Sequence, residues 1–245
     1  MRRGGWELTT RCDSPSTGLY FVAIHRFWHY DFLSVPTGKY DILLAASRDG
    51  ANNLTLLGGR TSWLRPTLEG TKGSRRLWLA PPGPVLYGNE ELYFVSRTNT
   101  AEYSGWRTID TQSPHGQWES EIAMGRLRRD GLVSLDAPYT RRTDASVLQT
   151  KPFVFSGRQL LVNVDPGGGG SLTIEVREHD ATGPVLLTSV PLVYNGVDIP
   201  VLFGAASPLM GGNATASAIA AFVGVPIQLT MVLRDCRLYG FRFAD

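Results

Sequence analysis

The chain of 245 residues is 42% hydrophobic, 10% aromatic and 19% charged, which excludes global disorder because enough apolar side chains are present to build a core. Its 24 basic and 22 acidic residues give a net charge of +2, so no basic excess indicates a nucleic-acid partner. The 27 glycines and 15 prolines favour many short elements joined by turns over long helices.

The N-terminal half contains strand-like runs separated by turns. Apolar strands are predicted at 19–24 and 40–46, and Asp49-Gly50 is a hairpin signal that predicts a returning strand at 53–57. A second hairpin is predicted for 84–95, with its turn at 88–91.

A further strand is predicted at 118–127. The sequence has neither an amphipathic helix of three turns nor a glycine-rich phosphate-binding motif. A Rossmann or TIM-barrel fold is therefore a poor interpretation, because both need strands that alternate with helices.

The C-terminal half alternates apolar and polar residues with a period of two at 160–165, 172–177 and 229–234, which predicts half-buried strands. The proline and four glycines at 166–170 predict a turn between the first two strands. The last strand, 237–243, is expected to place Tyr239, Phe241 and Phe243 on one face. The stretch 205–221 lacks alternation and predicts a long loop with one helical turn, whereas Asp49, Asp130 and Asp136 are typical of turns.

Several binding and targeting signals are absent from the sequence. Cys12 and Cys236 leave two alternatives, one disulfide or two reduced buried thiols, and a chain without a signal peptide favours the thiols. The two cysteines cannot form a zinc site alone and have no C-x-x-C spacing, and no metal and no cofactor are expected. No apolar run follows Arg2 and Arg3, so no signal peptide is recognised: the protein is expected to be cytoplasmic if Met1 is the true start and secreted if the chain is N-terminally truncated.

The weakly polar run at 214–225 falls short of the roughly 20 residues that span a bilayer, so no membrane association is expected. The oligomeric state stays open.

The segment 126–137, R-L-R-R-D-G-L-V-S-L-D-A, resembles the boundary between propeller and sandwich in five-bladed β-propeller glycosidase-like proteins, relatives of glycoside hydrolase families 32 and 43. In the same order, 150–153 (T-K-P-F), 157–163 (G-R-Q-L-L-V-N) and 233–241 (L-R-D-C-R-L-Y-G-F) resemble segments of the C-terminal sandwich of that family. The resemblance implies an all-β fold, with a partial β-propeller of about two blades at 1–128 followed by an antiparallel β-sandwich at 129–245.

The resemblance implies a glycoside hydrolase-like protein with a carbohydrate as its partner. Residues 1–128 are too few for five blades, so the chain is expected to be a C-terminal fragment in which the family's catalytic carboxylates would precede Met1. Arg75 and Arg76 stand where the family often has an aromatic residue and a carboxylate, and arginine cannot act as a general acid. We therefore expect no catalytic residue in this chain. The alternative is a non-catalytic carbohydrate-binding or structural β-module.

The candidate substrate-binding residues are His25, Trp28, Arg76, His115 and Glu119. The two histidines lie among aromatic residues, which suit sugar rings, and Glu119 shares a strand face with Glu121. Each also has a structural interpretation, as a histidine at a strand edge or as a solvated carboxylate on a strand.

Overall fold

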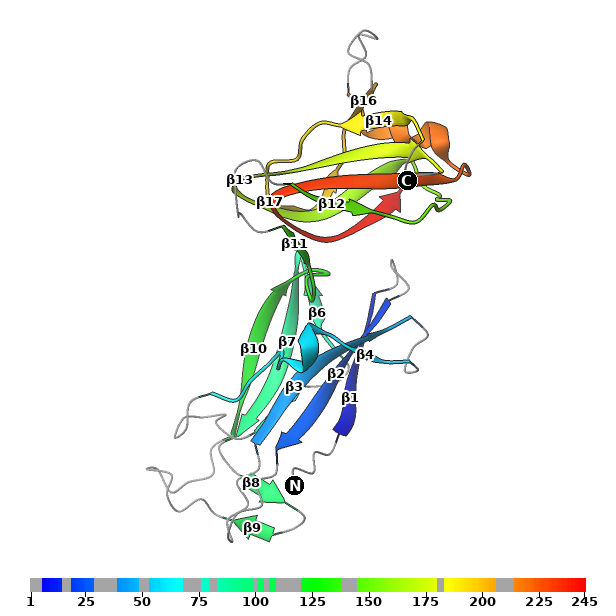
Figure 1. Ribbon diagram of the computed structural model, residues 1–245. Helices are drawn as coiled ribbons and strands as arrows, with labels where there is room; N and C mark the ends of the chain where they lie inside the picture. Colours follow the sequence, from blue (N-terminus) through cyan, green and yellow to red (C-terminus); the bar gives the residue numbers. More distant parts are fainter. Residues whose placement is uncertain are drawn as a thin grey trace. The chain divides into compact units, whose positions relative to one another are not determined.

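The computed structural model describes residues 6–14, 19–28, 39–48, 53–67, 76–79, 83–98, 101–103, 106–108, 120–137, 145–179, 183–205 and 214–245. The fold is all-β, as predicted: the described residues form antiparallel sheets and short 3₁₀ helices (Figure 1). The chain divides into two compact units, Met1–Leu127 and Arg128–Asp245. This division lies within one residue of the predicted domain boundary, whereas the identity of the units as propeller blades and sandwich stays a prediction.

The first sheet of the first unit consists of four antiparallel strands in chain order. The predicted strands at 19–24, 40–46 and 53–57 are found, the last of them shortened, whereas the sequence interpretation missed the first strand. In the third strand, residues 42–46 are all at most 9% exposed, so this strand is covered on both faces. The predicted turn at Asp49-Gly50 lies outside the described residues. The strands are β1 (Trp6–Ser14), β2 (Leu19–Trp28), β3 (Lys39–Ser47) and β4 (Thr55–Leu56).

After β4 the chain makes a short 3₁₀ turn, η1 (Gly58–Arg60), and runs back along β3. The amide of Ile42 donates to the carbonyl of Leu64 (2.9 Å), and the amide of Trp63 donates to the carbonyl of Ile42 (2.7 Å). These bonds place residues 62–64 against β3.

The second sheet is centred on β7, with β10 along one edge and β5 and β6 along the other. The predicted hairpin is present, but its turn consists of Gly88 and Asn89 alone, because Tyr87 pairs with Glu90. Gly88 has a φ of +61°, as tight hairpin turns require. The strands are β5 (Arg76–Leu79), β6 (Val85–Tyr87), β7 (Glu90–Thr98) and β10 (Ser120–Arg128), and a separate hairpin pairs β8 (Ala101–Tyr103) with β9 (Trp106–Thr108).

The second unit is built on two long strands, β13 (Gln159–Glu178) and β17 (Ile227–Ala244), which pair antiparallel along their length. The three predicted alternating runs lie in these strands, and their apolar residues face one core. This single core contains residues from both halves of β13 and both halves of β17. Its fully buried members include Leu160, Val164, Leu172, Ile174, Val176, Ile227, Leu229 and Met231.

The predicted turn at 166–170 was wrong, because β13 continues through it as a wide bulge. Pro166 pairs with Cys236 and Ser171 with Arg234, so that four glycines oppose Asp235 alone. A Cβ atom on Gly170 would lie 2.1 Å from the Asp235 carbonyl oxygen, so only glycine permits this approach. Figure 1 shows β13 and β17 bending together here, and their halves therefore form the two layers of the unit.

Shorter strands widen both layers of the second unit. The layer with the C-terminal half of β13 gains β12 (Ser146–Gln149), β14 (Val185–Ser189) and β16 (Phe203–Ala205). The other layer gains β11 (Leu135–Ala137) and β15 (Gly196–Pro200), so Asp136 lies in a strand and not in the predicted turn. The predicted loop at 205–221 ends in a 3₁₀ helix, η3 (Ala216–Phe222), whose Ile219 is fully buried.

A second bulge separates the aromatic residues of β17. Asn163 pairs with Gly240 and Val164 with Leu238, so Tyr239 is an extra residue in β17. The bulge shifts the alternation by one residue, and the prediction that Tyr239 shares a face with Phe241 and Phe243 was therefore wrong. Phe243 stacks on Phe155, with ring centroids 4.1 Å apart, whereas Tyr239 lies beneath an arginine.

Candidate functional site

The structure gives only backbone positions for three of the candidate substrate-binding residues. His25 and Trp28 lie in β2, opposite Ile42 and Lys39, and Arg76 begins β5 opposite Thr98. The side chains of His25, Trp28 and Arg76, and all of His115 and Glu119, lie outside what the structure describes. Their role in substrate binding stays a prediction.

Two carboxylates between β7 and β10 are held by arginine. Glu121 lies two residues after the candidate Glu119. It forms an ion pair with Arg97, and both side chains are about one-third exposed (30% and 29%). Glu90 is contacted by Arg126, whose Nε donates to Oε2 at 3.0 Å. Each of these two carboxylates therefore links β7 to β10 through an arginine.

Two further carboxylates of the first unit are buried, and the sequence interpretation missed both. Glu91 is 7% exposed and accepts a hydrogen bond from the Tyr93 hydroxyl at 2.6 Å, while Asp41 is 5% exposed and accepts one from Ser62. The rings of Trp63 and Tyr93 pack in a T-shaped arrangement, with centroids 5.4 Å apart. Because the peptide chain joins Ser62 to Trp63, these contacts form a continuous path from β3 to β7.

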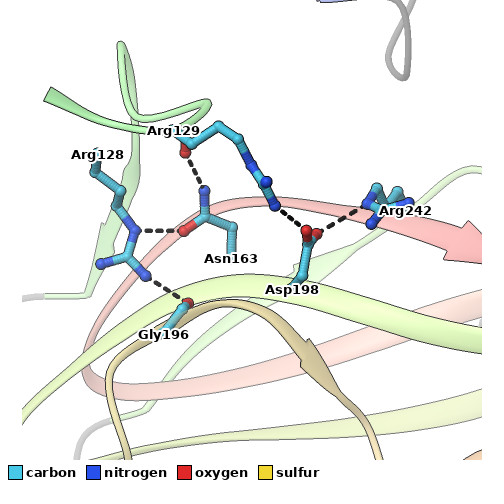
Figure 2. A network of polar contacts seen from close by, with 6 residues as sticks. All are labelled: Arg128, Arg129, Asn163, Gly196, Asp198 and Arg242. Atoms are coloured by element: carbon cyan, nitrogen blue, oxygen red, sulfur yellow. Dashed lines mark hydrogen bonds and ion pairs between the residues drawn. The ribbon is translucent and has the colours of Figure 1, made fainter. Parts of the chain in front are cut away.

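The best-defined polar cluster of the second unit surrounds Arg128 (Figure 2). Its Nε donates to Asn163 Oδ1, its Nη1 to Asn195 Oδ1, and its Nη2 to the carbonyls of Val164 (2.9 Å) and Gly196. The Tyr239 ring lies 4.7 Å from the guanidinium carbon, which is a cation–π distance. One side chain thus joins the start of the unit to β13, β15 and β17.

Arg129 extends this cluster to Asp198. The Asn163 side chain donates to the Arg129 carbonyl at 2.7 Å, and Arg129 Nη2 contacts Asp198 Oδ2. Arg242 Nε donates to the other carboxylate oxygen, Oδ1, at 2.8 Å (Figure 2). Asp198 has a φ of +57°, a conformation that aspartate adopts more readily than most residues. Both oxygens of this carboxylate are therefore engaged by arginine.

The electrostatics of the Arg128 cluster follow from burial. Desolvation lowers the pKa of Arg128, whereas Tyr239 and Asp165 act in the opposite direction. Arginine has the highest pKa of the ionisable side chains, so Arg128 remains a cation at neutral pH. Four of its five N–H donors bind acceptors of the protein, and this arrangement fastens the chain instead of offering a ligand site.

The turn that presents Arg128 and Arg129 depends on the two residues after them. The amide of Gly131 donates to the Arg128 carbonyl at 3.0 Å, and Asp130 has a φ of +53°, in agreement with its predicted place in a turn. A Cβ atom on Gly131 would lie 2.7 Å from the Arg128 carbonyl oxygen. The R-R-D-G sequence therefore sets the direction of both arginines.

Neither a metal site nor a membrane-spanning helix among the described residues, nor a relative, adds an assignment. Within the described ranges, no group of three or more histidine, cysteine, aspartate or glutamate residues could hold a metal ion. In the same part of the chain, no helix has the length and apolar character needed to cross a membrane. No protein-family model matches the sequence, and no curated protein matches it significantly.

Proposed function

We propose that the chain is a glycoside hydrolase-like protein whose described residues support glycan recognition and not hydrolysis. What supports this proposal is the segment with the strongest resemblance, 126–137, because it carries Arg128 and Arg129 into the network around Asn163 and Asp198. A boundary segment fastened in this way suits a unit that acts as a rigid support.

The carboxylates also favour recognition over hydrolysis. Glycoside hydrolysis needs a protonated acid and a second carboxylate, about 5 Å apart for retention and further apart for inversion. Glu90 and Glu121 are each paired with an arginine, and Glu91 and Asp41 are buried beside hydroxyl donors. None of these four is presented as a reactive pair to a sugar.

The test is to offer the full chain both hydrolysable and non-hydrolysable ligands. We expect no turnover of 4-nitrophenyl glycosides of glucose, xylose, arabinose, galactose and fructose, and measurable binding of at least one neutral oligosaccharide by calorimetry. Glu121→Gln and Glu119→Gln serve as matched variants. Turnover by the wild type that either substitution abolishes would contradict the proposal.

The second candidate is a structural β-module that binds no glycan. The four hydrogen bonds from Arg128 to other parts of the unit favour it, since the best-defined cluster serves to hold the unit together. This candidate predicts a stable chain that binds none of the oligosaccharides, and the calorimetric panel therefore separates the two.

A further inference from the structure

We infer that the outer face of one layer in the second unit binds a neutral oligosaccharide, an inference that rests on the proposed function and adds a location to it. Across four adjacent strands, β14, β13, β17 and β12, paired residues place four polar side chains in one row. Glu175 pairs with Thr188 and with Thr230, and Thr230 pairs with Gln149. The neighbouring residues Ile174 and Met231 point the other way, into the core. We call this row, together with Arg177 and Gln228, the polar face.

The polar face contains buried groups without a hydrogen-bond partner. Thr230 and Gln228 are 5% and 7% exposed, and neither Thr230 Oγ1 nor Gln228 Oε1 has a partner. The Gln228 amide nitrogen donates to the Thr150 carbonyl at 2.6 Å, which fixes the amide and leaves its oxygen unused. Arg177 Nε is also a buried donor without a hydrogen-bond partner, and Arg177 pairs with Gln228 across the strands. Unsatisfied buried groups destabilise a fold, so a ligand that satisfies them gains affinity.

The chemistry of the polar face selects the class of ligand. Arg177 Nη2 lies 2.6 Å from Glu175 Oε2, so their charges cancel, and the threonines and glutamines are neutral. Without excess positive charge the face does not suit a polyanion such as nucleic acid. It offers two oxygen acceptors and one N–H donor, and sugar hydroxyls both donate and accept hydrogen bonds. A neutral chain of sugars lying across the strands therefore fits this set of groups.

The charged pair flanks the buried atoms, because Glu175 pairs with Thr230 and Arg177 with Gln228 across the strands. The side chains of Glu175 and Arg177 are about one-quarter exposed (27% and 23%), and Gln149 at the margin is exposed. For Thr230 and Gln228 to meet the ligand, the Glu175–Arg177 pair must turn outward, which also breaks the hydrogen bond from Arg177 Nη1 to the Gly183 carbonyl (3.1 Å). The pair then contributes its own hydrogen-bonding groups to the sugar.

The test measures binding of cellohexaose, xylohexaose, arabinohexaose, mannohexaose and inulin to the full chain by calorimetry. The variants are Thr230→Val, which keeps the shape and removes the unpartnered hydroxyl, and Gln228→Met. The matched control is Gln159→Met, because Gln159 belongs to the half of β13 that lies in the other layer. We expect Thr230→Val and Gln228→Met each to raise the Kd of the bound oligosaccharide about tenfold or more, with the control unchanged.

Stability separates this inference from a purely structural role. Removing an unsatisfied buried hydroxyl leaves the melting temperature equal or higher, so weaker binding by Thr230→Val at unchanged stability would support a role in recognition. Binding within twofold of the wild type in both variants would overturn the inference and leave the proposed function standing. Failure of every oligosaccharide to bind the wild type would overturn both.

Discussion

The two units differ in what they place on the outer faces of their sheets. In the first unit, the face of β6, β7 and β10 that carries the Arg126–Glu90 pair is largely apolar and exposed, with Val85, Tyr87, Phe94, Ile122 and Met124 all at least 36% exposed. In the second unit, the corresponding outer surface is the polar face. The second unit bends β13 and β17 over their own core, which buries the apolar face of both strands, while apolar side chains outside these two strands, such as Val147 and Val193, are exposed. This difference teaches that a bent strand pair gives one face of both strands a shared core, so that the polar residues of the opposite face are the ones directed outward.

The largest loss of stability is expected from a substitution that removes the bend in β13 and β17. Gly170→Val places side-chain atoms against the Asp235 carbonyl, where a Cβ would already lie 2.1 Å away, and should cost about 3 kcal/mol or more. All six tryptophans belong to the first unit, so tryptophan fluorescence reports on that unit and far-UV circular dichroism on both. We expect the loss of stability to appear in circular dichroism and not in tryptophan fluorescence. Gly169→Ala is the control, because no atom lies within 4 Å of a Cβ at that position. Equal losses in both variants would refute the role of the bend.

A smaller effect on the free energy of unfolding is expected for two arginines of β10, and it should differ between them. Arg128→Met removes donors from Asn163, Asn195 and two carbonyls, and should lower the free energy of unfolding by about 2–4 kcal/mol. Arg126→Met breaks one exposed ion pair, with Glu90, and should cost at most about 1 kcal/mol. Urea unfolding followed by circular dichroism measures both. Similar costs for the two substitutions would show that the Arg128 cluster does not fasten the second unit.

The smallest effect concerns pH and the thiol beside the bend. Cys236 is a free, buried cysteine, and burial, followed by the nearby charges of Asp165 and Asp235, raises its pKa from 9.0 to about 12. The native state therefore keeps the thiol proton that the unfolded chain releases above pH 9, so this contribution to stability is present below pH 9 and is lost between pH 9 and 12. We expect the urea midpoint to fall less steeply over this range in Cys236→Ala than in the wild type. Parallel curves would contradict this expectation.

Much of the strand content was predictable because alternation of apolar and polar residues is a local signal. The runs that contain Leu160, Leu172 and Leu229 were recognised in this way, and all three are buried. The glycines at 167–170 were misinterpreted because glycine permits a turn and a bulge equally. The choice depends on whether both flanking runs pair with the same strand, which the sequence does not state. The bulge at Tyr239 depends in the same way on the register with Asn163.

The polar clusters were less predictable than the strands. The R-R-D-G segment was singled out by resemblance, but the partners of Arg128 and Arg129 lie in β13, in β15 and just before β15, brought together only by tertiary structure. Asp41 and Glu91 carried no signal, since a carboxylate within a strand resembles a solvated residue until its partner is known. The candidate residues His25, Trp28, Arg76, His115 and Glu119 stay predictions.

The pairing of β13 with β17 also has a consequence for the order in which the second unit folds. The pair Glu178–Ile227 closes the shortest loop between the two strands. The pair at the other end, Gln159–Ala244, closes the longest. Closing a longer loop costs more entropy, so the pairing is expected to advance from the first end to the second. The four glycines at 167–170 lie between the pairs that form early and those that form late. The layer that carries the polar face should therefore form before the layer that binds Arg128.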